Sequence, residues 1–318
     1  MSDIAVFGAG AFGTSLAIAL SRNGAEITLW CRDTDVATSM QTNRESGARL
    51  PGFPLPESLG VTSDIGSVQS DICLVAVPMQ SLRSFLETAD FGGRKLIACC
   101  KGIDVSTGMG PVATIRNAAP DALPALLTGP SFAADIARGL PTALTLAASD
   151  DTVASELQTA LSRPMLRLYR TSDTIGSELG GALKNVMALA SGMAIGAGFG
   201  DSARAAVIAR GFAEMSRYAS AKGALLETLQ GLSGLGDLVL TCTSEKSRNF
   251  RAGVCFGRGD SPEIMTIEGI ATAAAVADDA QLTGLDMPIT RAVAAVTSGE
   301  LDVKTAVEGL LSRPFRKE

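Results

Sequence analysis

The sequence predicts an α/β protein in which a parallel sheet covered by helices is followed by a second, entirely helical domain. Three observations predict this class. The first half alternates short apolar runs with helical patterns, and a glycine-rich turn follows the first run. The second half is rich in Ala, Leu, Gly and Met and has few β-branched runs. A length of 318 residues suits two domains of about 150 residues each. The change in composition between the two halves places these domains at 1–173 and 174–318.

The strands of the first domain are expected where apolar runs lie between helical patterns. A strand at 4–7 leads through glycines into a helix at 11–22, and Gly24 ends that helix. The further strands are expected at 26–30, 72–77, 96–100, 126–128 and 142–147. Continuous apolar runs are typical of parallel strands that are buried on both faces. Lys101 and Gly129 follow two of these strands, at the carboxyl ends where open α/β sheets bind ligands.

The second domain is expected to be built from helices at 177–193, 203–222, 268–282 and 289–298. The longest uncharged stretch of the chain, residues 4–21, lies in the first domain. It follows Asp3 rather than a basic segment, and glycines interrupt it, so it predicts neither a signal peptide nor a membrane span. We therefore expect a cytoplasmic protein.

The composition excludes several kinds of chemistry. The chain has no histidine, which removes Ser-His-Asp and Cys-His systems and the commonest ligand of catalytic zinc. A net charge of −6 argues against nucleic-acid binding. The six cysteines form no C-x-x-C pair, so we expect reduced thiols and no metal site. An acid/base group must be Lys, Asp, Glu, Tyr or Cys. Any pH dependence near neutrality is therefore expected to come from a lysine, a cysteine or a cofactor.

A G-x-G-x-x-G string at Gly8, Gly10 and Gly13 comes directly after a strand and opens a helix. The first glycine permits a tight turn, the second lets a pyrophosphate approach the backbone, and the third lets the helix pack against the strand. The free N–H groups at the start of the helix then bind the anion. This context predicts dinucleotide binding, with a glycine-rich structural turn or another nucleotide as the alternatives.

The end of the second strand bears on the choice of cofactor. Arg32 is placed to pair with a 2′-phosphate, which favours NADP, with NAD tolerated. Asp33 comes one or two residues late for the carboxylate that binds the ribose of NAD. The alternative is an exposed turn in which Arg32 and Asp33 pair with each other.

Lys184 lies on a predicted helix that is apolar around most of its circumference, which indicates a buried helix. Its neighbours on the helix surface are small, namely Gly180, Gly181, Ala188 and Ser191. Lys184 therefore has space beside it for a ligand or a close backbone. A lysine beside a partly buried pocket, with another cation nearby, has its pKa lowered toward the range useful for proton transfer. The alternative is a lysine that reaches from a core helix to solvent.

Two later segments are unusual. Residues 231–238 form a predicted loop in which three glycines surround the carboxylate of Asp237. Ser247, Arg248 and Asn249 then place a hydroxyl, a guanidinium and an amide at the start of a helix, an arrangement that suits an anion. The alternative for this tripeptide is an ordinary helix cap beside a solvated arginine.

Six strings together resemble the bacterial NAD(P)-dependent glycerol-3-phosphate dehydrogenases, over nearly the whole chain. They are GAGAFGTSLA at 8–17, LTGPSFAADIARGLPTA at 127–143, ELGGALKNVMALASG at 178–192, GDSARAAVIARGFAEM at 200–215, GLSGLGDLVLTCTSEKSRN at 231–249 and the EG pair at 268–269. The resemblance implies a Rossmann-type domain followed by a helical domain of the 6-phosphogluconate dehydrogenase C-terminal type. It implies reversible reduction of dihydroxyacetone phosphate to sn-glycerol 3-phosphate for phospholipid synthesis, and a homodimer.

The resemblance also implies roles for individual residues. Lys184 would be the general acid/base at the C2 oxygen of the substrate, Asp237 would orient it, and Lys101 would touch both substrate and cofactor. The other substrate residues would be Gly129, Ser131, Ser247, Arg248 and Asn249. The cofactor residues would be Gly8, Gly10, Ala11, Phe12, Gly13, Arg32, Lys101, Ala133, Arg248 and Glu268. A lysine acid/base agrees with the absence of histidine.

Two other functions compete with this interpretation. One is a β-hydroxyacid dehydrogenase of the same architecture that acts on a different small acid. It would not need the grip on a phosphate at 247–249. The other is a dinucleotide sensor or scaffold without activity, which decayed catalytic positions would favour; Lys101, Lys184 and Asp237 are all present.

Overall fold

The computed structural model describes residues 4–22, 24–262 and 267–312. The chain forms two compact units. The first unit comprises Met1–Asp104 and Met109–Glu178, and the second unit comprises Val105–Gly108 and Leu179–Glu318. Among the described residues, none of the helices combines the length and the apolar character needed to cross a membrane.

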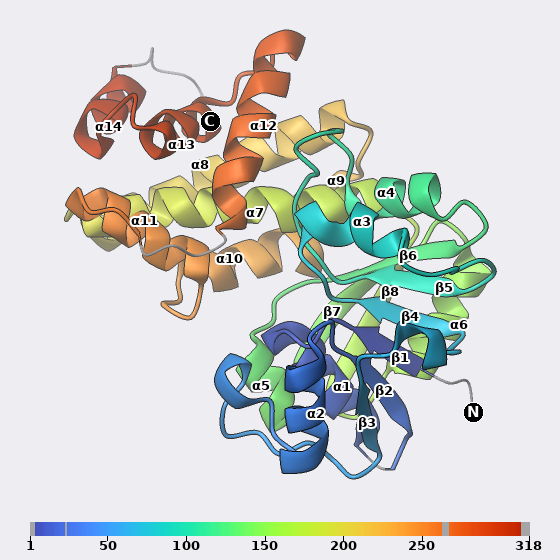
Figure 1. The fold of residues 1–318 in the computed structure, drawn as a ribbon. Coiled ribbons are helices and arrows are strands. Elements are labelled where there is room, and N and C mark those ends of the chain that lie inside the picture. The colour runs from blue at the N-terminus through green and yellow to red at the C-terminus, as the bar shows by residue number, and fades with distance from the viewer. Residues whose placement is uncertain (1–3, 23, 263–266, 313–318) are drawn as a thin grey trace. The chain divides into compact units, whose positions relative to one another are not determined.

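The first unit is built around an eight-stranded sheet with the order β3-β2-β1-β4-β5-β6-β7-β8 (Figure 1). The strands are β1 (Ile4–Phe7), β2 (Ile27–Trp30), β3 (Leu59–Thr62), β4 (Ile72–Val75), β5 (Lys95–Ala98), β6 (Leu123–Thr128), β7 (Thr142–Ala147) and β8 (Leu166–Thr171). The chain runs outward from β1 to β3 on one side and then from β4 to β8 on the other. The order therefore reverses between β1 and β4, and open α/β sheets bind ligands beside such a point.

The helices of this unit cover both faces of the sheet. They are α1 (Ala11–Ser21), α2 (Thr34–Asn43), α3 (Leu82–Leu86), α4 (Pro111–Ala118), α5 (Ala133–Arg138) and α6 (Asp151–Leu161), with short 3₁₀ turns η1 (Gly47–Arg49), η2 (Ile65–Ser67) and η3 (Met79–Ser81). Successive strand residues point to opposite faces. Thus Val6 packs in one buried cluster with Leu16 of α1, and Phe7 packs in another with Phe85 of α3.

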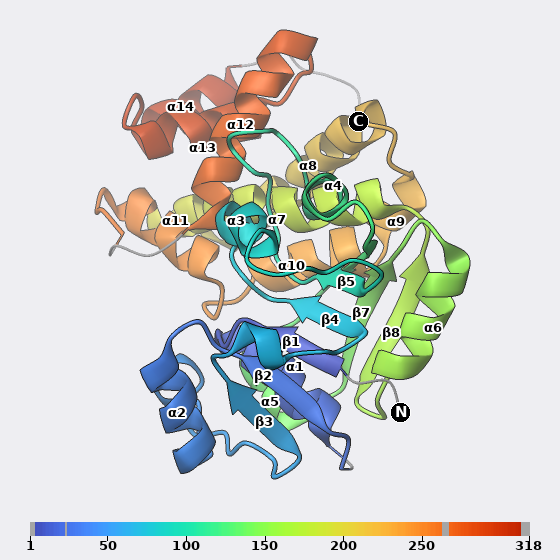
Figure 2. The same cartoon turned by 45° about the vertical axis from the view of Figure 1, so that its right-hand side comes forward.

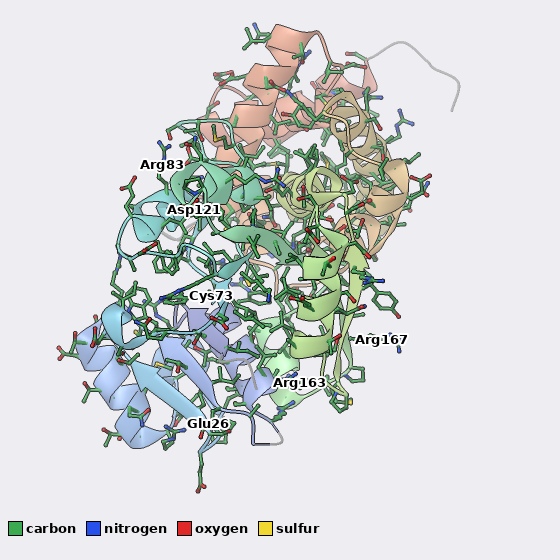
Figure 3. All side chains as sticks on the ribbon, turned by 90° about the vertical axis from the view of Figure 1, so that its right-hand side faces the viewer. Glu26, Cys73, Arg83, Asp121, Arg163 and Arg167 are labelled. Carbon is green, nitrogen blue, oxygen red and sulfur yellow. The ribbon has the colours of Figure 1, made fainter. Side chains whose placement is uncertain are left out.

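Two strands and one strand direction differ from the sequence prediction. β3 and β8 were not predicted, because their sequences LGVT and LRLYRT lack the continuous apolar run of a buried strand. They form the two edges of the sheet (Figure 2). Arg167 of β8 is exposed and stacks on Tyr169 at 5.3 Å (Figure 3).

β7 is antiparallel to β6, so the prediction of a purely parallel sheet is wrong at this pair. The connection between the two strands holds only one six-residue helix, α5. The length of this helix does not decide the direction, because the parallel pair β4 and β5 is joined through a helix of only five residues, α3. The pairing of β7 with β6 sets the direction, and no local feature of the sequence predicts it.

The second unit is helical. Its elements are α7 (Thr174–Gly196), whose first five residues belong to the first unit, α8 (Gly200–Ala221), α9 (Leu226–Gln230), the π-helical turn η4 (Leu232–Gly236), α10 (Asp237–Cys242), α11 (Arg248–Arg258), α12 (Glu268–Thr283), α13 (Pro288–Ser298) and α14 (Val303–Leu311). α7 and α11 touch through their backbones, since a Cβ atom at Gly253 would lie 2.2 Å from Leu189 O.

The segment predicted as a loop at 231–238 is helical. η4 covers Leu232–Gly236, and α10 begins at Asp237. Packing overrides the low helix propensity of its glycines. A Cβ atom at Gly180 of α7 would lie 2.6 Å from Ser233 O, and one at Gly234 would lie 2.0 Å from Leu229 O. π-helical turns occur frequently at functional sites. With helical elements in the second unit and the sheet in the first, the predicted fold class is confirmed.

Candidate active site

The glycine fingerprint forms a tight turn between β1 and α1. Gly8 has a φ of 111°, and its N–H donates to Trp30 O over 2.9 Å. A Cβ atom at Gly13 would lie 2.0 Å from Gly8 O, so this glycine lets the helix pack against the turn. By contrast, a Cβ atom at Gly10 would meet nothing within 4 Å.

Gly10 is the N-cap of α1, and no side chain caps this helix. Ala11 and Phe12 form its first positions and are partly exposed. The start of α1 therefore combines uncapped N–H donors with open space at Gly10, and these features fit the pyrophosphate of a dinucleotide.

Arg32 and Asp33 have separate environments at the end of β2. Asp33 is the N-cap of α2, and its Oδ1 accepts hydrogen bonds from Asp35 N and Val36 N at 3.0 Å each. Arg32 is exposed and is not ion-paired to Asp33 in the described part of the chain. The alternative of an Arg–Asp pair is therefore wrong. Since α2 uses the carboxylate, Arg32 is the charged group at this strand end that fits a 2′-phosphate.

Lys101 and Gly129 meet just beyond neighbouring parallel strands. Lys101 follows β5, Gly129 follows β6, and Lys101 Nζ donates to Gly129 O at 3.2 Å. Ser131 Oγ donates to the same carbonyl at 3.3 Å. Ala133 follows as the first residue of α5 and is partly exposed. Three predicted substrate residues therefore converge on one carbonyl group.

In the second unit, Lys184 forms a buried ion pair. Its Nζ donates to Asp237 Oδ1 at 2.9 Å and to Thr241 Oγ1 at 2.8 Å. Lys184 is 7% exposed and Asp237 is 1% exposed. The alternative of a lysine that reaches solvent is therefore wrong. A buried ammonium group held by two oxygens has a defined direction, as a positioned acid/base group needs.

A second polar cluster joins α7, α11 and α12. Asn185 Nδ2 donates to Glu268 Oε2 at 3.4 Å, and Asn249 Oδ1 accepts from Gly269 N at 3.0 Å. Asn249 is buried, so its carbonyl oxygen holds the start of α12. Its Nδ2 is the part of this side chain that fits the predicted role on the substrate.

Ser247 and Arg248 open α11. Ser247 is the N-cap, and its Oγ accepts from Phe250 N at 3.2 Å. Arg248 is the first helical residue and is exposed. The hydroxyl of Ser247 is therefore used within the helix start, and the guanidinium of Arg248 is the group of this tripeptide that fits an external phosphate.

Three of the cysteines are excluded as acid/base groups. Burial raises the pKa of the Cys99 and Cys242 thiols to about 12 and that of Cys73 to about 11. Cys73 lies inside the first unit (Figure 3). Such thiols are protonated at neutral pH and inert. All six cysteines are free. Nowhere in residues 4–22, 24–262 and 267–312 do three or more His, Cys, Asp or Glu side chains gather in a metal-binding group.

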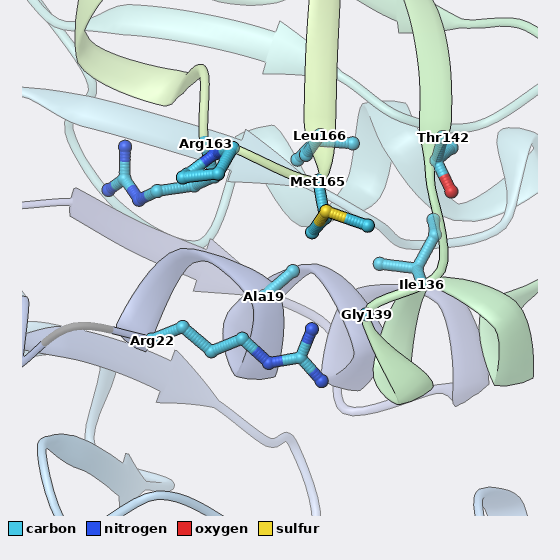
Figure 4. Close-up of a pocket in the computed structure, with 9 residues that line it drawn as sticks. Ala19, Arg22, Ile136, Gly139, Thr142, Arg163, Met165 and Leu166 are labelled. Carbon is cyan, nitrogen blue, oxygen red and sulfur yellow. The ribbon is translucent and has the colours of Figure 1, made fainter.

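A pocket far along α1 from the fingerprint contains two arginines (Figure 4). Arg22 donates to Ala137 O at the end of α5, and Arg163 Nε donates to Leu20 O at the end of α1. These guanidinium groups cap helix C-termini. Arg22 lies twelve positions beyond Gly10, which is about 18 Å along a helix. This pocket is therefore separate from the predicted site.

Thr241 and Asn185 were not predicted as site residues from the sequence. Thr241 lies four positions after Asp237, so both face the same side of α10, but that spacing has meaning only once the segment is helical. Asn185 directly follows Lys184 in the string ELGGALKNVMALASG at 178–192. Its contact with Glu268 spans 83 residues and has no local signal.

A sheet with a fingerprint turn in one unit and a buried lysine–carboxylate pair in a helical unit are the features of a two-domain, dinucleotide-dependent dehydrogenase. The family model for the NAD-dependent glycerol-3-phosphate dehydrogenase N-terminus matches residues 3–154, and the model for the C-terminus matches residues 173–308. The chain belongs to this family, which confirms the resemblance of its motifs.

Individual proteins agree with this assignment over their full lengths. The chain is 57% identical to a glycerol-3-phosphate dehydrogenase (NAD(P)+) from a Ruegeria species, covering 99% of this chain and 100% of that protein. It is 54% identical to one from Paracoccus denitrificans, with the same coverage. The crystal structure of the Coxiella burnetii glycerol-3-phosphate dehydrogenase matches with a TM-score of 0.92 at 34% identity, covering 98% of this chain and 99% of that one.

Proposed function

We propose that this chain is a glycerol-3-phosphate dehydrogenase that reduces dihydroxyacetone phosphate reversibly to sn-glycerol 3-phosphate, for glycerophospholipid synthesis. The observation that carries the proposal is the Lys184–Asp237–Thr241 arrangement in a full-length member of the family. The cofactor is NADP by preference, or NAD. Support for NADP comes from the exposed Arg32 and from the use of Asp33 by α2.

The residues of the chain stabilise the charge that develops during the reaction. When bound, the nicotinamide cofactor supplies the hydride that reaches the C2 carbonyl carbon. The electron pair of the carbonyl bond then moves to oxygen, where negative charge builds up. Lys184 stabilises that oxygen and transfers a proton to it, and neutral Lys184 removes this proton in the reverse direction. Asp237 and Thr241 hold Lys184 in position during both steps.

The remaining assignments are proposals of the same kind. Lys101 contacts both substrate and cofactor and adds positive charge near the reacting oxygen. The substrate is held by Gly129, Ser131, Lys184, Asp237, Ser247, Arg248 and Asn249. The cofactor is held by Gly8, Gly10, Ala11, Phe12, Gly13, Arg32, Ala133, Arg248 and Glu268. In this division of labour, residues 1–173 bind the cofactor and residues 174–318 carry the acid/base group.

The test is NADPH oxidation with dihydroxyacetone phosphate, compared with non-phosphorylated 2- and 3-oxo acids at equal concentration. We expect turnover with dihydroxyacetone phosphate and little with the oxo acids, because Arg248 pairs with phosphate. Equal rates with both substrate classes would contradict the proposed phosphate site and favour another hydroxyacid dehydrogenase. NADPH binding without turnover of any substrate would favour a sensor or scaffold.

We further propose a cytoplasmic homodimer, with no nucleic-acid partner. The exposed side chains of Leu225, Leu226 and Val239 on the helical elements support self-association, and the free cysteines suit a reducing compartment. Light scattering coupled to size-exclusion chromatography tests the dimer, and a mass equal to one chain would contradict it.

A further inference from the structure

Glu178 is a carboxylate that the proposed reaction does not use. It lies on the first turns of α7, and its Oε1 accepts a hydrogen bond from Val112 N at 2.5 Å. Among the described residues this is its only hydrogen bond. Gly110 makes room for the carboxyl group, because a Cβ atom there would lie 2.7 Å from Glu178 Cδ. Glu178 therefore holds the start of α4 from outside that helix.

The segment that Glu178 holds begins at Lys101. Residues 102–110 connect Lys101 to α4, and Val105–Gly108 among them belong to the second unit. Two contacts within the first unit hold the residues on either side of Val105–Gly108. Gln80 Nε2 donates to Ile103 O at 2.8 Å, and Asp104 N donates to Met109 O at 2.9 Å. The positions of Lys101 and the start of α4 are therefore linked by a short, internally bonded segment.

Glu214 likewise holds the start of a helix, but more hydrogen bonds offset the cost of burying its charge. Each of the two glutamates accepts from the first turn of a helix that begins with proline, α4 for Glu178 and α13 for Glu214. Glu214 accepts hydrogen bonds from Ile289 N at 2.6 Å and from both Thr290 N and Thr290 Oγ1 at 3.1 Å. Three hydrogen bonds therefore stabilise the charge of Glu214, whereas Glu178 has one.

The weaker compensation brings Glu178 into the neutral range. Burial raises its pKa to about 7, while the hydrogen bond from Val112 and then the attraction of Arg116 on α4 act in the opposite direction. Arg116 also donates to Ser149 Oγ at 2.8 Å. On the N-terminal turn of α7, the nearby carboxylate of Asp173 is used by Gly176 N, which donates to its Oδ1 at 2.8 Å.

We propose that Glu178 is a positioning residue for Lys101. Its carboxylate holds the start of α4, and through the Asp104–Met109 hydrogen bond residues 102–104, in the arrangement that keeps Lys101 beside Gly129, and protonation of Glu178 releases that hold. The neutral acid loses the charge-assisted hydrogen bond and the attraction to the positive end of α4. The inference rests on the proposed function, in which Lys101 contacts the substrate.

Stability and activity should respond to pH with opposite signs. The pKa of Glu178 in the folded chain, about 7, lies above its ordinary value of 4.5. Its contribution to stability is therefore complete below pH 4.5 and is lost as the pH rises through about 7. The proposed contribution to activity instead appears as the pH rises through the same range. A charge that lowers stability where it acts is what a functional constraint produces.

The experiment compares the wild type with Glu178→Gln and with the matched control Glu214→Gln. For each protein, kcat and KM for dihydroxyacetone phosphate are measured between pH 5.5 and 8.5 at saturating NADPH. With a pKa near 7, we expect wild-type kcat/KM to be about tenfold lower at pH 6 than at pH 8. Titration of the substrate phosphate affects all three proteins equally. Glu178→Gln should lose most of this pH dependence and retain the low value, while Glu214→Gln should keep the wild-type profile.

Two further measurements do not need turnover. Amine acylation of Lys101, followed by mass spectrometry, should differ between the wild type and Glu178→Gln at pH 8 and coincide at pH 5.5. The melting temperature of the wild type should fall between pH 6 and pH 8 more than that of Glu178→Gln. If the wild type fails to reduce dihydroxyacetone phosphate, the proposed function fails, and labelling of Lys101 still tests the positioning role. Identical labelling of the wild type and Glu178→Gln at every pH, or an unchanged activity profile in Glu178→Gln, overturns the inference.

Discussion

The turn at Gly8–Gly13 in the first unit and the Lys184 pair in the second unit are opposite kinds of site. The turn presents backbone N–H groups without a side-chain cap, and open space surrounds Gly10. Lys184 is buried, and Asp237 and Thr241 hold its charged group within hydrogen-bond distance. The turn is therefore suited to bind an anionic ligand. In the Lys184 pair, by contrast, the carboxylate of Asp237 already balances the charge of the ammonium group.

This difference shows why the two regions should tolerate change differently. The backbone donors of the turn are accessible because glycine has no side chain. A Gly→Ala substitution, which adds one methyl group, therefore tests this site. A buried ion pair depends on both partners, and removing one leaves an uncompensated charge. Substitutions in the turn should therefore affect cofactor affinity, and substitutions in the pair should affect turnover and stability.

The largest expected effect is that of Lys184→Ala. Turnover should fall by about 10²–10⁴-fold, the usual contribution of a positioned acid/base group. NADPH affinity, measured by fluorescence titration, should stay near the wild-type value because the fingerprint is untouched. Retention of more than about a tenth of the rate would place the acid/base group at another residue.

Stability is the control for this variant. Lys184→Ala leaves Asp237 buried without its cation, which costs about 3–5 kcal/mol. The double variant Lys184→Ala with Asp237→Asn should recover much of the melting temperature and none of the turnover. If turnover returned together with stability, loss of folding would explain the defect of the single variant.

Gly10→Ala and Gly13→Ala form a matched pair in the turn. A Cβ atom at Gly13 would lie 2.0 Å from Gly8 O, so Gly13→Ala should destabilise the chain by about 1–3 kcal/mol. A Cβ atom at Gly10 would meet nothing, and its extended φ of −74° suits alanine, so Gly10→Ala should fold with near wild-type stability. We expect Gly10→Ala to weaken NADPH binding all the same, because the methyl group occupies the pyrophosphate space.

Melting curves and NADPH titrations of the two glycine variants separate packing from binding. Wild-type NADPH affinity in Gly10→Ala would show that the pyrophosphate does not approach this backbone. The turn would then not be the anion-binding site that distinguishes the first unit from the Lys184 pair.

The smallest expected effect is a change of cofactor preference in Arg32→Glu. NADPH should bind several-fold more weakly while NADH changes little, because an exposed guanidinium contributes about 1 kcal/mol to such a contact. The ratio of kcat/KM for the two cofactors measures the change, and Arg49→Glu, on the η1 turn of the same unit, is a matched charge reversal. If Arg32→Glu has the same ratio as the wild type, Arg32 is only an exposed turn residue and does not bind the 2′-phosphate.

Much of the fold could be predicted because it depends on local patterns. Buried strands such as β1 and β4 are continuous apolar runs, and the change in composition after β8 marks the helical unit. The edge strands β3 and β8 could not be predicted in the same way, because each has one face toward solvent and needs a neighbour to become a strand. The antiparallel direction of β7 was not predicted either, because it depends on how this strand pairs with β6 and has no local signal in the sequence.

For the candidate site, the resemblance implied that Asp237 orients Lys184, but the contacts of Thr241 with Lys184 and of Asn185 with Glu268 were not predicted. The absence of histidine left Lys, Asp, Glu, Tyr and Cys as possible acid/base groups, and the resemblance of the motifs to the dehydrogenase family implied Lys184 among them. Residues 231–238 were predicted as a loop because glycines disfavour helices in isolation. Residues 232–242 are instead helical, and this conformation places Thr241 against Lys184. The expectation that pH dependence near neutrality comes from a lysine, a cysteine or a cofactor omitted Glu178, because the burial that raises its pKa exists only after distant segments such as α4 have packed against it.

The sequence by itself determined the class of fold, the turn that suits a dinucleotide and the exclusion of histidine as an acid/base group. Each of these follows from periodicity, composition or short spacing, which act between neighbours in the chain. Tertiary structure decided that Lys184 pairs with a carboxylate 53 residues away and that Glu178 holds a helix start 66 residues away. Burial and hydrogen bonding set the charge state of such groups, and both exist only after distant segments have packed together.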